Sequence, residues 1–101
     1  MLDDEALLSL LSSLRTACGS GQVVFLPKAS GELLKMGWSG QQALNVLSQL
    51  VDDDYDRTEW STFHGGVDLH TFMPPSDDSP DDLFIRIYEH DGFVCVSFHW
   101  A

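Results

Sequence analysis

The first half of the chain carries hydrophobic residues at helical spacing. Leucines recur on one face of residues 4–17, after an acidic start that suits a helix N-terminus. A short extended segment is expected over residues 22–26, and a second helix over residues 30–36. A third helix opens at Ser39, because Gln42 follows three residues later and completes a capping box.

In the second half the hydrophobic period changes from helical to two, which is typical of strands. The pairs Gly65-Gly66 and Asp91-Gly92 indicate tight hairpin turns, and residues 74–82 form a polar, acidic loop. Helices followed by hairpin-linked strands predict an α+β fold, with the helices packed on one face of a roughly four-stranded antiparallel sheet. The expected strands are residues 59–64, 67–73, 83–88 and 93–98.

Length and composition fit a single domain with its own core, since the chain has 101 residues and 44% of them are hydrophobic. It contains no apolar run of the roughly 18 residues that a membrane-spanning helix needs. Acidic residues follow Met1 where a secretory signal would begin with basic ones. Cys18 and Cys95 lie far apart and lack metal-site spacing, which favours reduced core thiols. We therefore expect a cytoplasmic protein without a cofactor or a metal.

The net charge of −11 is concentrated in three clusters, and apart from these and Arg57 the acidic and basic residues cancel. An acidic field repels a phosphate backbone and attracts basic protein surfaces. The charge therefore argues against direct nucleic-acid binding and favours a basic protein partner. The plain alternative is that the clusters are solvated ends and loops. The clusters are Asp3, Asp4 and Glu5; Asp52, Asp53, Asp54, Asp56 and Glu59; and Asp77, Asp78, Asp81 and Asp82.

The middle and last clusters, with two aromatic residues beside them, form the expected partner-binding surface. Aromatic side chains next to carboxylates make good anchors for a basic protein, although they can equally cover the rim of a core. The expected partner-binding residues are Asp52, Asp53, Asp54, Tyr55, Asp56, Glu59, Trp60, Asp77, Asp78, Asp81 and Asp82.

Histidines are the candidates for acid–base chemistry. Simple alternation puts His70 on one face of its strand and puts His99 on the same face as Cys95 in the last strand. Two histidines that met across the sheet would form an acid–base pair for cleaving RNA, with Arg57 or Arg86 stabilising the charged transition state. The common alternative is ordinary surface histidines, and no two of them have metal-ligand spacing. The chain's histidines are His64, His70, His90 and His99.

Short motifs spread over most of the chain occur in the order found in one known family. These motifs are Gly21-Gln22-Val23, the helix break at Gly37, Asn45-Val46-Leu47, Asp54-Tyr55, His64, Pro74 and Val96-Ser97-Phe98. In this order the chain resembles the MqsR family, bacterial toxins that cleave messenger RNA and have the RelE-like fold. The resemblance implies that fold, and it implies an RNA-cleaving ancestry.

The residues at the family's catalytic positions differ here. The family places a lysine after the tyrosine of its Asp-Phe-Tyr-Lys motif, where this chain has Asp56, and ends in Val-Ser-Phe-Lys, where this chain has His99. Its Trp-Gln-Asp-Val-Tyr strand corresponds to residues 68–72, which lack the glutamine and the tyrosine hydroxyl. Of the catalytic residue types only Tyr55 carries over directly. An aspartate in place of lysine turns attraction for an RNA phosphate into repulsion.

Two functions follow from these patterns, with a purely structural subunit as a third. The first is an acidic inhibitor of the immunity-protein, antitoxin or anti-CRISPR type, which blocks a basic, nucleic-acid-handling partner such as a nuclease toxin or a CRISPR effector. The second is a divergent MqsR-type endoribonuclease toxin. The reversed charge favours the first. The catalytic residues of the second would be Tyr55, Arg57, His64, His70 and His99.

Overall fold

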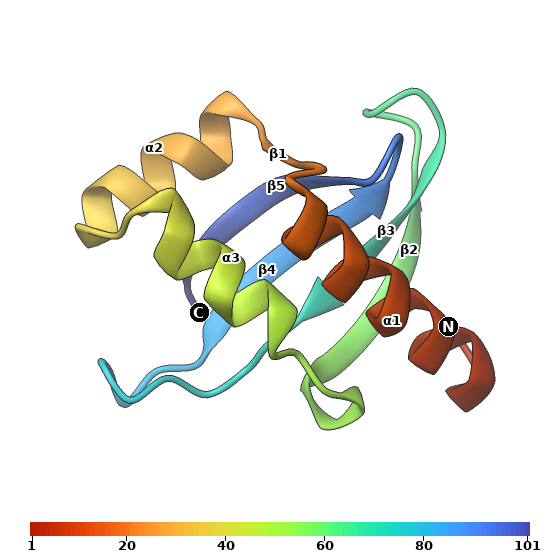
Figure 1. Cartoon of the computed structure of the whole chain (residues 1–101), viewed down its shortest axis with the longest axis horizontal. Coiled ribbons are helices and arrows are strands. Elements are labelled where there is room, and N and C mark those ends of the chain that lie inside the picture. Colours follow the sequence, from red (N-terminus) through yellow and green to blue (C-terminus); the bar gives the residue numbers. More distant parts are fainter.

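Three helices and a five-stranded sheet form two layers, which confirms the α+β class (Figure 1). The computed structural model describes residues 1–101. In Figure 1, α1 and α3 cross one face of the sheet, and α2 lies beyond β5. The elements are α1 (Asp4–Ser20), β1 (Val23–Phe25), α2 (Pro27–Met36), α3 (Gly40–Ser48), a 3-10 turn η1 (Asp52–Asp54), β2 (Tyr55–Ser61), β3 (Val67–Phe72), β4 (Leu83–Glu89) and β5 (Phe93–Trp100).

Local sequence signals set the helix ends. The capping box of α3 is confirmed: Ser39 Oγ accepts from the Gln42 backbone N–H at 3.1 Å, and Gln42 Oε1 accepts from the Ser39 N–H at 2.7 Å. Helix α1 ends at Gly21, whose φ of 74° is left-handed. Helix α2 begins three residues earlier than predicted, at Pro27, because the fixed φ of proline suits the first helical position.

The sheet has the strand order β1-β5-β4-β3-β2. It is mixed, because β1 pairs parallel to β5 while all the other pairs are antiparallel. The short extended segment expected over residues 22–26 contains β1, but the prediction of about four antiparallel strands did not place it in the sheet, because three residues are too short to show alternation. A bulge interrupts β5: Ser97 pairs with Arg86 and Cys95 with Ile87, so Val96 has no partner.

The predicted start of β2 was wrong by four residues, since the strand begins at Tyr55 and ends at Ser61. Residues 62–64, which were expected to extend it, form the turn instead. The period-two pattern does not reveal the first half of this strand, because β2 lies at the edge of the sheet and Asp56, Arg57 and Glu59 give it a polar surface. Charged residues on an edge strand hinder edge-to-edge aggregation.

The core lies between the helices and one face of the sheet, and the opposite face stays open except where α2 borders it. No helix is both long and apolar enough to cross a membrane. Both cysteines are free thiols, and burial raises the pKa of the Cys95 thiol to about 12. The largest fully buried hydrophobic residues are Leu11, Leu14, Leu47, Leu50, Phe72, Leu83, Ile85, Ile87, Phe93, Cys95 and Phe98.

Candidate functional site

Two of the three acidic clusters, in η1 and in residues 74–82, lie at the same end of the sheet, which we call the acidic end (Figure 1, lower edge). The end of β3 meets η1, because the Met73 N–H donates to the Asp54 carbonyl at 2.7 Å. The C-terminal residue donates its N–H to the Asp82 carbonyl at 2.8 Å, which brings in the acidic loop. The third cluster, at the start of α1, lies beside the edge strand β2, where the Leu2 N–H donates to the Tyr55 hydroxyl at 3.0 Å.

Most carboxylates of the acidic end point into solvent without a positive partner. The exceptions are Asp56 and Glu59, which both pair with Arg57. These two contacts raise the pKa of Arg57, with the hydrogen bond that Arg57 donates to Glu59 as the largest cause. The guanidinium is thereby occupied, so Arg57 does not offer the free charge that phosphate stabilisation requires. The predicted partner-binding carboxylates that form no ion pair are Asp52, Asp53, Asp54, Asp77, Asp78, Asp81 and Asp82.

The two expected anchor aromatics have different surroundings. Trp60 is 68% exposed, as an anchor should be. Tyr55 packs its ring on Phe72, with the centroids 5.6 Å apart, on the helix-covered face of the sheet. Its hydroxyl lies 2.6 Å from Thr58 Oγ1, which in turn lies 2.8 Å from His70 Nδ1. Tyr55 therefore serves as a link in an internal hydrogen-bond chain.

The hydrogen bonds of this chain favour one tautomer of His70. The Leu2 N–H can only donate, so the Tyr55 hydroxyl accepts from it, and both hydroxyl protons then find an acceptor within the chain only if Tyr55 donates to Thr58 and Thr58 donates to Nδ1 of His70. This arrangement leaves the proton of the neutral ring on Nε2. Burial lowers the pKa of His70, against a smaller opposing effect of Asp68. The neutral ring is therefore the resting form near neutral pH.

We expect His70 to make the fold sensitive to acid. The unfolded chain protonates this histidine near its ordinary pKa of about 6.5, and the folded protein only at lower pH. The stabilising contribution is therefore present above the unfolded pKa and is lost as the pH falls through the folded pKa. In His70→Asn, whose amide oxygen can still accept from Thr58, the loss in free energy of unfolding between about pH 7 and pH 5 should shrink. The exposed His90→Asn should keep the full loss, and an unchanged profile in His70→Asn would contradict this prediction.

The expectation that His99 shares a face with Cys95 was wrong. The bulge at Val96 shifts the alternation by one residue, so Cys95 points into the core while His99 stacks on Phe84 across the open face at 5.0 Å. His70 lies on the helix-covered face. The two histidines are on opposite sides of the sheet and cannot act on one phosphate.

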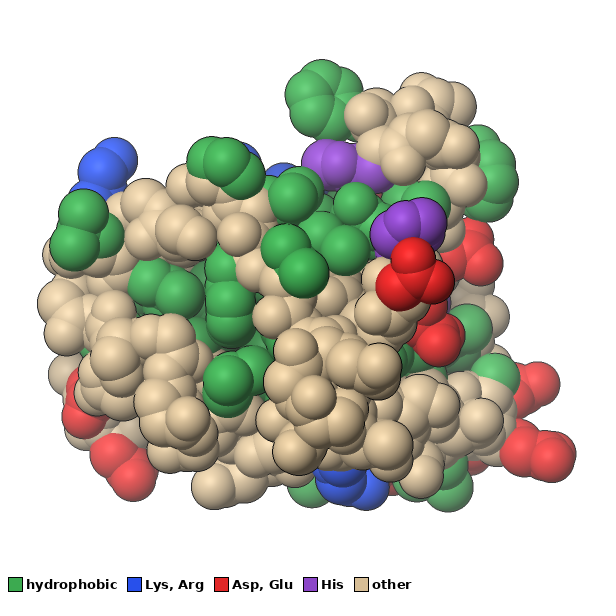
Figure 2. Space-filling view, turned by 45° about the horizontal axis from the view of Figure 1, so that its top comes forward, with side chains coloured by type: hydrophobic (Ala, Val, Ile, Leu, Met, Phe, Trp, Pro, Cys, Tyr) green, Lys and Arg blue, Asp and Glu red, His purple; other side chains and the backbone are tan.

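His64 lies on the open face, next to Tyr88, with the ring centroids 5.4 Å apart. His64 contacts Tyr88 and His99 contacts Phe84. Because Phe84 and Tyr88 are four residues apart on β4, the two histidines are separated by about 13 Å. The two rings flank Arg86 without facing each other. Figure 2 shows hydrophobic side chains gathered in its upper half with a histidine beside them, and the structure has an open groove there of about 470 Å³, lined in part by Leu26, Phe63, His64, Leu69 and Val96.

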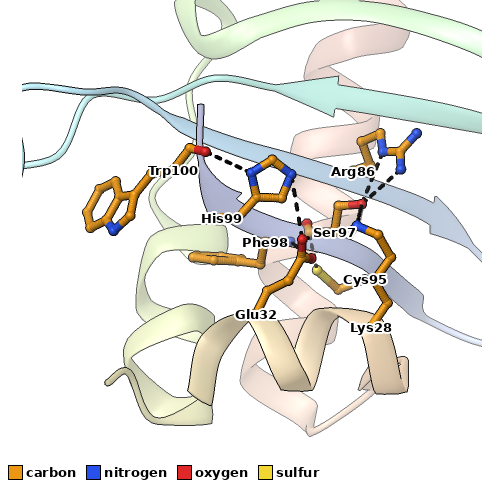
Figure 3. Close-up of polar contacts among 8 residues, drawn as sticks. All are labelled: Lys28, Glu32, Arg86, Cys95, Ser97, Phe98, His99 and Trp100. Carbon is orange, nitrogen blue, oxygen red and sulfur yellow. Dashed lines mark hydrogen bonds and ion pairs between the residues drawn. The ribbon is translucent and has the colours of Figure 1, made fainter. Parts of the chain in front are cut away.

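A polar cluster crosses the open face beside this groove (Figure 3). Its centre is the buried hydroxyl of Ser97, which lies 2.9 Å from Lys28 Nζ and 3.0 Å from Arg86 Nη2. Arg86 forms no ion pair and packs over the Phe84 ring at 5.7 Å. Two cations thus share one neutral hydroxyl. Ser97 is buried beneath them, so it is not placed to attack a substrate.

Glu32 completes the cluster on the α2 side. Its Oε1 accepts the Phe98 N–H at 3.0 Å, and its Oε2 lies 3.1 Å from Lys28 and 3.6 Å from His99 Nε2. The second half of β5 has no strand beyond it, so this carboxylate satisfies an edge N–H that β1 is too short to reach. Sequence analysis missed Glu32 and Ser97, although the spacing of Lys28 and Glu32 fits an i,i+4 helix pair.

None of the alternative catalytic residues forms an acid–base pair. Tyr55 and His70 belong to the helix-covered face, Arg57 is neutralised, and His64 and His99 are separated. No group of three or more histidine, cysteine or carboxylate residues is arranged to hold a metal ion. The largest collection of uncommitted charge is the acidic end. The chain matches no known protein-family profile and no curated protein sequence.

Proposed function

We propose that the protein is an acidic binding protein that blocks a basic, nucleic-acid-handling partner such as a nuclease, in the manner of an immunity protein, an antitoxin or an anti-CRISPR protein. The gathering of η1 and the acidic loop of residues 74–82 at one end of the sheet, with seven aspartates that form no ion pair, supports this proposal above all. A concentrated field of one sign draws in a partner of opposite sign and speeds association.

The fold and the chemistry agree with such a role. A divergent relative of the MqsR toxins that keeps the fold, but carries acid where RNA would bind, would suit inhibition better than cleavage. The absence of a facing acid–base pair removes the main support for the ribonuclease alternative. A reducing, cytoplasmic location is part of the proposal, and the two free thiols support it.

Neutralising the acidic end should slow association with the partner captured from the native host. Asp52→Asn with Asp53→Asn removes two unpaired charges and keeps the side-chain oxygens as hydrogen-bond acceptors. We expect the association rate at low salt to fall about tenfold, and its dependence on salt to weaken, with little change in dissociation. Stopped-flow or surface-binding kinetics with the captured protein measure all three.

The matched control changes the net charge equally at the other end of the sheet. His90→Lys with Asp91→Asn adds the same two units at exposed positions of the β4–β5 turn, and asparagine tolerates the left-handed φ of 49° at residue 91. This control should bind at nearly the wild-type rate. Equal slowing in both variants would show that net charge alone matters, and no slowing in either would contradict the proposal.

A further inference from the structure

A pocket of about 600 Å³ opens between α1 and the ends of β3 and β4 that lie away from the acidic end. It is distinct from the open-face groove, because it lies on the helix-covered side of the sheet. Leu2 and, in the first turn of α1, Ala6 form part of its wall, so the pocket lies close to the acidic start of this helix. Its charged and aromatic lining consists of Trp60, Asp68, His70 and Glu89.

Two carboxylates line this pocket without a positive partner. The β3–β4 ladder ends at the pair of His70 with Ile87, and Asp68 and Glu89 lie two residues beyond it on the two neighbouring strands. Neither carboxylate forms an ion pair with any basic side chain of the chain. Like charges close together on neighbouring strands are destabilising. A cation between them would relieve that repulsion.

Trp60 adds an aromatic wall in a defined position. It pairs with Asp68 in the β2–β3 ladder, and its ring lies over Gly66, where an added Cβ would come within 3.0 Å of Trp60 Cζ2. The glycine thus lets the indole lie flat beside the pocket while most of its surface stays exposed. An exposed indole face attracts guanidinium and ammonium groups.

His70 adds a hydrogen-bond donor that has no acceptor. The side chain is only 5% exposed, and the chain from Leu2 through Tyr55 and Thr58 holds its Nδ1. The protonated Nε2 of this pocket-lining ring makes no hydrogen bond within the protein. The site thus presents two carboxylates and an indole for a cation, with one fixed N–H for a neutral acceptor such as a carbonyl oxygen.

We propose that this pocket binds an arginine residue of the basic protein partner. The guanidinium enters between Asp68 and Glu89 and stacks on Trp60, and His70 Nε2–H donates to a backbone carbonyl of the partner. Arginine fits better than lysine because its planar fork reaches two carboxylates and stacks on an aromatic ring. This inference rests on the proposed function, since it names the chemistry by which that partner is gripped.

The test uses N-acetyl-arginine N-methylamide as the probe and its citrulline counterpart, a neutral isostere, as the control ligand. Nuclear magnetic resonance of the full chain follows the Trp60 indole N–H and the His70 imidazole resonances. We expect saturable shifts with the arginine probe and none with citrulline. Asp68→Asn with Glu89→Gln should weaken binding about tenfold while leaving the protein folded and no less stable. Leu34→Lys with Gln41→Lys makes the same change in net charge at exposed helix positions outside the pocket and should bind like wild type.

Shifts that do not saturate, equal shifts with citrulline, or equal weakening in both double variants would overturn the pocket assignment. The kinetic experiment on Asp52 and Asp53 reports separately on the proposed function. If those substitutions slow association with the captured protein while the probe does not bind, the inhibitor function stands and the pocket fails. If the probe binds and no protein depends on the acidic end, the pocket stands and the inhibitor function fails.

Discussion

Gly92→Ala is expected to lower the free energy of unfolding by about 3 kcal/mol or more. Gly92 has a φ of +102°, and a Cβ there would lie 2.1 Å from the backbone oxygen of Gln22. That oxygen accepts the Phe93 N–H at 2.9 Å, next to the pairing of β1 with β5. The methyl group therefore has to push apart the backbone contact that attaches β1 to the sheet. Chemical denaturation measures the loss directly.

Gly65→Ala is the matched control for this prediction. Gly65 also has a left-handed φ, +85°, but an added Cβ would meet nothing within 4 Å. We expect it to cost about 1 to 2 kcal/mol, the price of the backbone conformation alone. The difference between the two variants isolates the collision with Gln22. Equal losses would mean that the β4–β5 turn relaxes freely and that the close approach is not structurally important.

Glu32→Ala is expected to cost about 2 to 3 kcal/mol. The side chain is 18% exposed and accepts the Phe98 N–H while it offsets Lys28. Without it, the edge N–H of β5 loses its acceptor and Lys28 loses its counter-charge. Denaturation should show the loss, and hydrogen exchange at the Phe98 amide should accelerate more than exchange elsewhere in β5.

Glu32→Gln separates the two contributions, because glutamine keeps an oxygen for the Phe98 N–H and removes only the charge. We expect it to retain more than half of the stability that alanine loses, and to keep the Phe98 amide protected. If glutamine and alanine are equally harmful, the ion pair with Lys28 is the essential contact and the edge hydrogen bond is not.

Signals confined to a few neighbouring residues predicted much of the fold. The Ser39–Gln42 box and the Asp91-Gly92 turn each depend on contacts within four residues, so the sequence alone reveals them. The bulge at Val96 has no comparable signal, since valine fits a regular strand equally well. Because a bulge reverses every later side chain, that one residue decided the face of His99.

The candidate site was less predictable because it depends on long-range contacts. The acidic residues were evident, but their meeting at one end follows from pairs such as Met73 with Asp54, which join β3 to η1. Asp68 and Glu89 come to neighbouring strands through the pairing of β3 with β4. The length of the loop between these strands does not reveal the register of that pairing. Thr58, which orients His70, appeared in the sequence as an unremarkable edge residue.

The position of β5 in the sheet affects how the nascent chain folds during synthesis. This last strand lies inside the sheet, between β1 and β4, and supplies Phe93 and Phe98 to the core under the helices. While the ribosome is still making it, the three helices have no complete surface on which to bury their leucines. The core therefore closes only after β5 has been synthesised, and until then the leucine faces of the helices stay exposed to solvent.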